Sequence, residues 1–263
     1  MKKLLPIGLL AFFLMPVSAM AQSAFDGTWK VDMSKAHLPE KPDVYLLQAD
    51  MYHCKSCVPA VEVKADGHDQ KVTGHPYYDS MSIKIVDDHS IEETDKIAGK
   101  TVATSKWTVS PDGNTLIVEF SNSSDTNAAS VSGKGEAIRV AKGPANSHVI
   151  SGSWRESKLE NLSDNALLLT LKLEGDTLSM NNPTGASYSA KLDGTDAPYN
   201  GDPGITSVSV KRMGKDSFQE TDKRDGKVIS VAKITVAPDG RIMTIAVTDK
   251  LHGTTSEFQA LKQ

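Results

Sequence analysis

The sequence predicts an all-β protein built from two tandem antiparallel up-and-down β-barrels. Three observations lead to this prediction: the chain duplicates itself, its apolar side chains alternate with period two, and turn residues recur about every 8 to 12 positions. Alternation indicates strands with one buried face, and closely spaced turns indicate an antiparallel meander. A meander of this kind protects its edge strands by closing into a barrel.

The duplication is the strongest signal in the 263-residue chain. Asp66–Gly113 aligns with Asp193–Gly240 at a constant offset of 127, without a gap, and about 21 of these positions are identical. Further upstream, Gly27-Thr28-Trp29 recurs as Gly152-Ser153-Trp154. The chain is therefore a repeated unit of roughly 120 residues, which is long enough for each copy to bury a core of its own.

The repeat sets the expected domain boundaries. We expect a first barrel over residues 22–143, a linker over Lys142–Asn146, and a second barrel over residues 147–263. Each unit has room for about eight or nine strands, and a barrel of that size can hold one small ligand. A single barrel of some 16 strands is disfavoured, because such barrels are mainly membrane porins and an aromatic content of 6% shows no porin-like girdle.

Alternation predicts the individual strands in both copies. Met81 and its apolar neighbours alternate with Ser and Lys, and Val208 and Val210 repeat the pattern in the second copy. Pro-Asp-Gly forms the corresponding turn in both copies. Ser121–Ser132, rich in Ser, Asn and Asp, predicts a flexible loop, and Asn161–Leu168 is the one segment with some helical character.

The first 21 residues resemble a secretory signal peptide. Lys2 and Lys3 provide the positive start, Leu4–Val17 is an apolar run too short to span a bilayer, and Ala19-Met20-Ala21 provides a small-x-small cleavage site. We therefore expect an exported protein, periplasmic or secreted, that begins near residue 22 and has no integral membrane segment in its mature part.

Charge argues against two classes of partner. Without the two signal-peptide lysines the chain carries 27 basic and 33 acidic side chains. A chain this acidic lacks the basic surface that binds nucleic acid or an anionic membrane. A small molecule is the expected partner.

The two Gly-x-Trp segments resemble the motif that opens lipocalins and related calycin barrels, and also the first strand of exported bacterial proteins that begin with Gly-Thr-Trp-Lys. The resemblance implies that Trp29 and Trp154 close the barrel floor, each beneath a basic residue from the last strand. Arg139 fits that role in the first copy, and Lys262 is a poorer match in the second. The lipocalin Thr-Asp-Tyr signature is missing. Simple core packing of both Trp residues is the alternative.

Cys54 and Cys57 are the only cysteines, and their Cys-x-x-Cys spacing has three interpretations. In an exported protein a disulfide is the simplest, since the second copy has the turn sequence Asn181–Gly185 at this place. The second is a zinc site completed by His68 and His75, although the spacing matches no common finger. Thiol redox chemistry is the third. Apart from this zinc site, no cofactor is expected.

A repeated Glu-Thr-Asp-Lys block places two carboxylates on one face of a strand in each copy: Glu93 with Asp95, and Glu220 with Asp222. If Ile91 and Phe218 face the lumen, these carboxylates do too, and they are the candidate residues for binding a cation or polar ligand or for acid/base chemistry. The alternative is a solvated strand end whose carboxylates pair with lysines of the same block or of the next strand. Their presence in both copies favours this scaffold interpretation.

Fold and composition together favour a binding protein for a small hydrophobic or amphipathic ligand held in a barrel lumen. A hydrolase or isomerase, using a barrel-mouth carboxylate or a metal in the first copy, is the second hypothesis. A ligand-free envelope scaffold with filled lumens is the third. Enzymatic activity is left open, with binding preferred.

Overall fold

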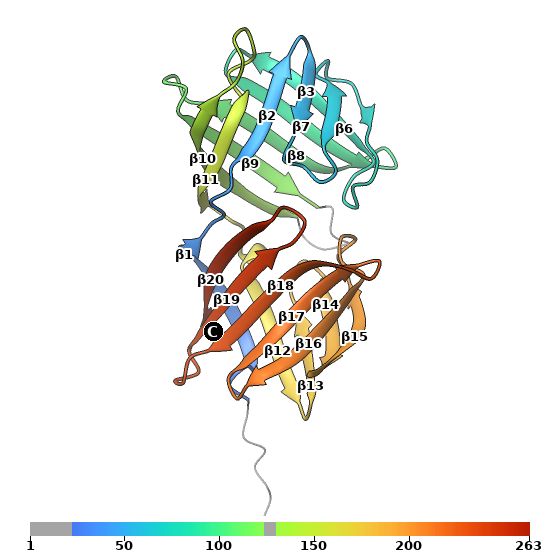
Figure 1. The fold of residues 1–263 in the computed structure, drawn as a ribbon, viewed down its shortest axis with the longest axis vertical. Helices are drawn as coiled ribbons and strands as arrows, with labels where there is room; N and C mark the ends of the chain where they lie inside the picture. The colour runs from blue at the N-terminus through green and yellow to red at the C-terminus, as the bar shows by residue number, and fades with distance from the viewer. Residues whose placement is uncertain (1–22, 124–129) are drawn as a thin grey trace, which may run out of the picture.

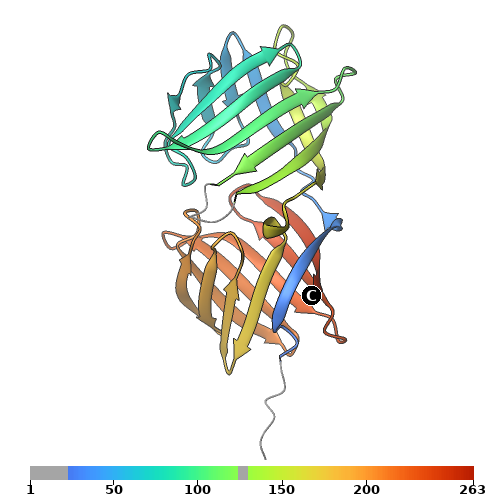
Figure 2. The same cartoon turned by 180° about the vertical axis from the view of Figure 1, so that it is seen from behind.

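The computed structural model describes residues 23–123 and 130–263, and their regular structure is twenty β-strands and one short 3₁₀ turn. The strands form two antiparallel ten-stranded sheets, each curved into a barrel, stacked along the long axis of the molecule (Figures 1 and 2). This confirms the predicted fold class. In the part of the chain that is described, no helix is long and apolar enough to cross a membrane. The expected signal peptide, 1–21, and the centre of the expected 121–132 loop lie outside the described residues.

One sheet is a closed barrel, here called the C-barrel. Its strands, in the order in which they pair around the barrel, are β1 (Gly27–His37), β12 (Leu168–Glu174), β13 (Thr177–Asn181), β14 (Ser187–Lys191), β15 (Asp193–Asn200), β16 (Ser207–Gly214), β17 (Ser217–Arg224), β18 (Lys227–Val236), β19 (Ile242–Asp249) and β20 (Thr254–Lys262).

The other sheet, here called the N-barrel, pairs its strands in the order β4-β3-β2-β11-β10-β9-β8-β7-β6-β5. The segment just after β4 reaches the opposite side of this sheet: Asp66 bridges to Lys84 on β6, and the Gly67 N–H donates to the Ile83 carbonyl at 2.9 Å. The strands are β2 (Asp43–Gln48), β3 (Met51–Cys54), β4 (Val61–Lys64), β5 (Gln70–Lys71), β6 (Ser80–Asp87), β7 (Ser90–Ile97), β8 (Lys100–Val109), β9 (Thr115–Asn122), β10 (Val131–Lys142) and β11 (Gly152–Glu160).

The two copies exchange their first strands. β1 pairs with β12 and β20 in the C-barrel, and β11 pairs with β10 and β2 in the N-barrel. The N-barrel is thus a continuous segment inserted into a discontinuous C-barrel. The division expected between residues 143 and 147 is wrong for this reason: the repeat unit in sequence is not the folded unit, since equivalent Gly-x-Trp strands can fill either barrel.

The exchange also corrects the expected pairing at the barrel floors. Trp29 and Trp154 are fully buried, and their indole N–H groups donate to backbone carbonyls at 2.9 and 2.8 Å. Arg139 lies over Trp154, with its guanidinium carbon 3.9 Å from the ring centroid, and Lys262 lies 5.0 Å from the ring of Trp29. Each tryptophan therefore sits beneath a basic side chain, as the lipocalin resemblance implies, but Arg139 covers the tryptophan of the other copy.

Local chemistry accounts for the remaining differences. Gly113 and Gly240, in the two Pro-Asp-Gly turns, have φ angles of 75° and 69°, a region that glycine adopts without strain. The segment 161–168, expected to have helical character, contains only the 3₁₀ turn Asp164–Ala166. Each barrel has ten strands rather than eight or nine. The sequence misses short strands such as β5, because two residues are too few to show alternation.

Candidate functional site

Strand alternation places the repeated carboxylates inside the barrels. On β7, Ile91 is fully buried and Glu93 and Asp95 point to the same side, where they line a cavity in the N-barrel. On β17, Phe218 and Asp222 are buried in the same way. Ile91 and Phe218 therefore face the interior, as the sequence argument required, and the carboxylates lie on the same face of their strands.

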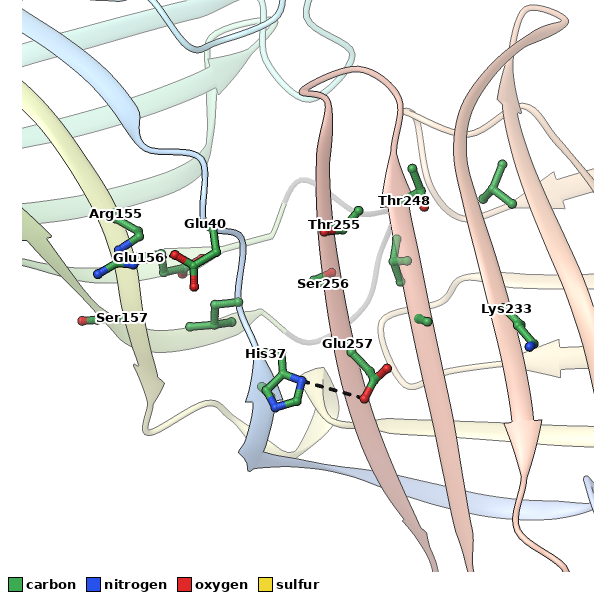
Figure 3. Close-up of a pocket in the computed structure, with 15 residues that line it drawn as sticks. His37, Glu40, Arg155, Glu156, Ser157, Lys233, Thr248, Thr255, Ser256 and Glu257 are labelled. Atoms are coloured by element: carbon green, nitrogen blue, oxygen red, sulfur yellow. Dashed lines mark hydrogen bonds and ion pairs between the residues drawn. The ribbon is translucent and has the colours of Figure 1, made fainter. Parts of the chain in front are cut away.

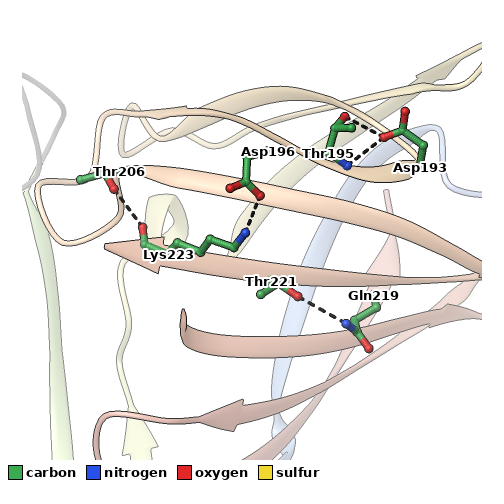
Figure 4. Close-up of polar contacts among 7 residues, drawn as sticks. All are labelled: Asp193, Thr195, Asp196, Thr206, Gln219, Thr221 and Lys223. Carbon is green, nitrogen blue, oxygen red and sulfur yellow. Dashed lines mark hydrogen bonds and ion pairs between the residues drawn. The ribbon is translucent and has the colours of Figure 1, made fainter. Parts of the chain in front are cut away.

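The lysines of the repeated block point the other way. Lys223 forms an ion pair with Asp196 at 2.5 Å on the outside of the C-barrel (Figure 4). In the N-barrel the equivalent pair, Lys96 with Asp69, is 2.7 Å long. The lysine is therefore the scaffold part of the block, holding two strands together, and it does not neutralise the carboxylates of its own block as the scaffold interpretation expected.

In the N-barrel the carboxylates are poorly compensated. Burial, and then repulsion from Asp95, raise the pKa of Glu93 to about 8, and burial raises the pKa of Asp95 to about 7. Glu93 accepts one long hydrogen bond, 3.4 Å, from the hydroxyl of Ser105, which itself accepts from the Trp107 indole at 2.7 Å. The Oδ1 atom of Asp95 is buried and has no hydrogen-bond partner among the described residues.

In the C-barrel the same pair has strong donors. The hydroxyl of Tyr188 donates to Glu220, and that of Ser230 donates to Asp222 at 2.6 Å. Burial still raises both pKa values, that of Glu220 to about 7. One oxygen of Asp222, Oδ1, lacks a partner in the described part of the chain.

The difference between the copies lies in two neighbouring positions. Ser230 lies directly opposite Asp222 on the adjacent strand, whereas Ala103 lies opposite Asp95. Tyr188 corresponds to Val61 at the offset of 127. The carboxylates are thus duplicated, but the two strong hydroxyl donors, Tyr188 and Ser230, are present only in the C-barrel, and the N-barrel pair has the long hydrogen bond from Ser105. A buried acceptor left without a donor costs about 1–3 kcal/mol, and each barrel has one such oxygen, on Asp95 and on Asp222.

Two adjoining cavities occupy the N-barrel interior. A cavity of about 250 Å³ contains the Glu93–Asp95 pair, and one of about 230 Å³ extends toward Glu156. They share three side chains: Trp107, Val118 and Phe120. We call this combined space the N-lumen. Among the described residues, no Lys, Arg or His lines either cavity.

The far end of the N-lumen is also acidic and aromatic. Burial, followed by the charge of Asp43, raises the pKa of Glu156. Tyr45 contacts Trp107 edge to face, with ring centroids 4.9 Å apart. Burial raises the pKa of the Tyr45 hydroxyl well above its usual value, and the charges of Asp43 and Glu93 add to the shift. The lumen therefore combines aromatic walls with carboxylates at both ends.

A larger groove lies between the two barrels, where the chain passes from the end of β1 to β2 (Figure 3). It has a volume of about 790 Å³, and its charges are largely paired: Arg155 with Glu40 at 2.5 Å, and His37 with Glu257 at 3.8 Å. Glu156 lines both this groove and the N-lumen, so the two spaces adjoin. Sequence reasoning missed the groove, because it exists only when β1 and β11 are exchanged.

The cysteine region is a disulfide and not a metal site. Cys54 and Cys57 are bonded to each other, which confirms the expected bridge and leaves no thiolate for zinc. His68 is exposed beside Asp66, at 3.4 Å, and His75 stacks on Tyr78. In the residues that the structure describes, no cluster of three or more His, Cys, Asp or Glu side chains could hold a metal ion. The zinc hypothesis is therefore wrong for this set of residues.

A third space, of about 400 Å³, contains His75 where the barrels meet. The Nε2 atom of His75 is buried without a partner in the described segments, and burial lowers the pKa of its ring. Beside it the hydroxyl of Tyr77 donates to Asp202 at 3.0 Å, across the interface. A side chain at Gly204 would collide with that hydroxyl, so glycine here allows the barrels to approach.

Comparisons of the chain with protein-family models, with curated proteins and with solved structures gave no match.

Proposed function

We propose that this chain is an exported binding protein that holds a small amphipathic molecule in the N-lumen, within a barrel of lipocalin-like type. The observation that carries the proposal is the N-lumen itself: adjoining cavities with walls of Trp107, Phe120 and Tyr45, and with a carboxylate pair in which Asp95 Oδ1 has no partner among the described residues and Glu93 has only a long hydrogen bond from Ser105. Aromatic walls with a few convergent polar groups are typical of small-molecule sites. The signal-like first 21 residues support export.

The two copies support a division of roles. In the C-barrel the equivalent carboxylates have strong hydroxyl donors, Tyr188 for Glu220 and Ser230 for Asp222, and the aliphatic Ile234 stands where the N-barrel has Trp107. We infer that the C-barrel is the supporting unit and that the N-barrel is the binding unit. The adjoining groove shares Glu156 with the N-lumen, which supports entry of the ligand from that side.

Binding of Nile red, a neutral apolar dye, tests the proposal. Val118 lines both cavities, so Val118→Phe fills the N-lumen, while Ile245→Phe makes the same change at the equivalent C-barrel position. We expect the parent and Ile245→Phe to bind the dye, and Val118→Phe to bind it at least about tenfold more weakly. Equal binding by all three would show that the dye lies elsewhere.

Native mass spectrometry of the mature protein, purified gently from its own exported pool, is the companion experiment. An adduct of a few hundred daltons that Val118→Phe loses would identify the ligand. A protein free of adducts that also fails to bind Nile red would support the scaffold hypothesis instead.

An acid/base enzyme is a second candidate, favoured by one observation. The pKa of Glu93, about 8, and that of Asp95, about 7, lie near neutral pH, where a carboxyl can both give and take a proton. Chemical conversion of the recovered ligand by the parent, and not by Glu93→Gln, would select this candidate.

A further inference from the structure

The N-lumen has a chemical preference that follows from the charges around it. Five of its lining side chains are carboxylates: four form no ion pair with a basic side chain of the described residues, and the fifth, Glu136, is paired with Lys134 at 2.8 Å. The four are Glu93 and Asp95 at one end and Asp43 and Glu156 at the other. At about pH 8, where Asp95 and part of Glu93 are ionised, an anionic ligand would add a like charge to this set, which is unfavourable.

The carboxylate pair of the N-barrel has weaker hydrogen-bond donors than the equivalent pair of the C-barrel. In the C-barrel, hydroxyls at positions 188 and 230 donate to the carboxylates, whereas the equivalent Val61 and Ala103 of the N-barrel offer no donor and only the long hydrogen bond from Ser105 reaches Glu93. The buried Oδ1 atom of Asp95 faces this unsatisfied space. A ligand that brings N–H groups to the pair would supply what Tyr188 and Ser230 supply in the other copy.

The walls suit an organic cation better than a bare metal ion. A divalent cation such as Ca²⁺ needs six to eight oxygen ligands, and the described residues contain no cluster of three or more metal-ligating side chains. Trp107 and Phe120, by contrast, line the cavity beside Glu93 and Asp95. Aromatic rings attract ammonium groups through their negative faces and also cover an apolar body.

We propose that the N-lumen selects a small organic cation: an amphipathic amine whose ammonium group lies between Glu93 and Asp95 and whose apolar body lies against Trp107 and Phe120. This inference rests on the proposed binding function and names the class of ligand. The repeated carboxylates are ligand-binding in the N-barrel and structural in the C-barrel, which is how a duplicated pair acquires two roles.

A matched series of ligands tests the charge preference. The three compounds 4-phenylbutylamine, 4-phenylbutanol and 4-phenylbutanoate share one apolar body and differ in a cationic, neutral or anionic end. Isothermal titration of the mature protein at pH 8 should give the amine at least about tenfold higher affinity than the alcohol, and the carboxylate the weakest binding.

Two double variants locate the selectivity. Glu93→Gln with Asp95→Asn should bring the amine down to the affinity of the alcohol, because it removes the charge and keeps the shape. The matched pair Glu220→Gln with Asp222→Asn in the C-barrel should leave the series unchanged.

The outcomes separate the two proposals. Equal affinity for amine and alcohol, with both lost in Val118→Phe, would overturn the cation inference and leave the binding function standing. Loss of the preference for the amine in the C-barrel variant, Glu220→Gln with Asp222→Asn, would also overturn the inference. Absence of binding by every compound and by Nile red would overturn both.

Discussion

Replacing Glu93 by Gln should change how the stability of the chain depends on pH. In the folded chain burial keeps the proton on Glu93 up to about pH 8, whereas in the unfolded chain the proton leaves near the usual value of 4.5. As pH rises from about 4.5 to about 8, the unfolded state therefore binds fewer protons than the folded state. The free energy of unfolding falls across this window, and the stabilising contribution is fully present only below it.

The size of the effect follows from the pKa values. A shift from 4.5 to about 8 corresponds to about 3 to 5 kcal/mol of stability lost by pH 8, at 1.36 kcal/mol per pKa unit. The titratable groups around Glu93 come from several elements. They are Asp95 on β7, Tyr45 on β2, Tyr52 on β3 and Tyr78 in the loop before β6. Of these only Asp95 titrates in the same window.

Urea unfolding at pH 5, 6, 7 and 8 measures the change. Glu93→Gln should match the parent within about 1 kcal/mol at pH 5 and exceed it by about 3 to 5 kcal/mol at pH 8, which is a rise of about 1 to 1.5 M in midpoint. Glu92→Gln is the matched control, because Glu92 is exposed beside Lys84 at 3.4 Å and should change the midpoint little. Parallel curves for parent and Glu93→Gln across the whole range would refute the reasoning.

Three further predictions concern the architecture. In a double-mutant cycle, Arg139→Ala and Trp154→Phe should couple by about 1 to 2 kcal/mol of unfolding free energy, and additivity would contradict the cation–π contact between them. Tyr188→Phe should lower stability at pH 8 by about 1 to 3 kcal/mol, since it leaves a buried carboxylate without its donor; unchanged thermal unfolding would count against that hydrogen bond. A fragment spanning residues 39–162 contains every strand of the N-barrel and should fold alone, whereas 22–143 lacks β11 and should not; hydrogen exchange that shows both protected would argue against strand exchange.

The fold class could be predicted from the sequence because both of its signals are local. Alternation reports which face of a strand is buried, and the turn residues report where strands end. The placement of Glu93 and Glu220 inside their barrels followed from the same period, once Ile91 and Phe218 were taken as interior. The disulfide was predictable because three residues of separation leave little choice of partner.

Strand exchange could not be predicted, because β1 and β11 carry the same Gly-x-Trp motif and fit either barrel. The asymmetry of the site escaped prediction for a related reason. Val61 and Ala103 are ordinary strand residues in sequence. They matter only because they occupy the positions from which Tyr188 and Ser230 donate in the other barrel. Only the strand register shows that the N-barrel lacks the counterparts of the Tyr188 and Ser230 hydroxyls.

The insertion of one barrel into the other sets an order of folding. β1 is the first strand to leave the ribosome, yet its partners, β12 and β20, come after the whole N-barrel. Until then β1 is an unpaired edge that other chains can reach. The N-barrel can close as soon as residue 160 is available, and its pairing of Asp43 with Trp154 holds the two ends of the insertion side by side.

Holding these two ends together makes pairing of the C-barrel strands β1 and β12 less costly in chain entropy. A loop of more than a hundred residues between β1 and β12 becomes a short effective connection once the insertion has folded, so less chain entropy is lost when the two strands meet. The folded N-barrel thus brings the first two strands of the C-barrel close together. Anything that delays its closure, including unfavourable ionisation of its interior carboxylates, delays the assembly of the entire molecule.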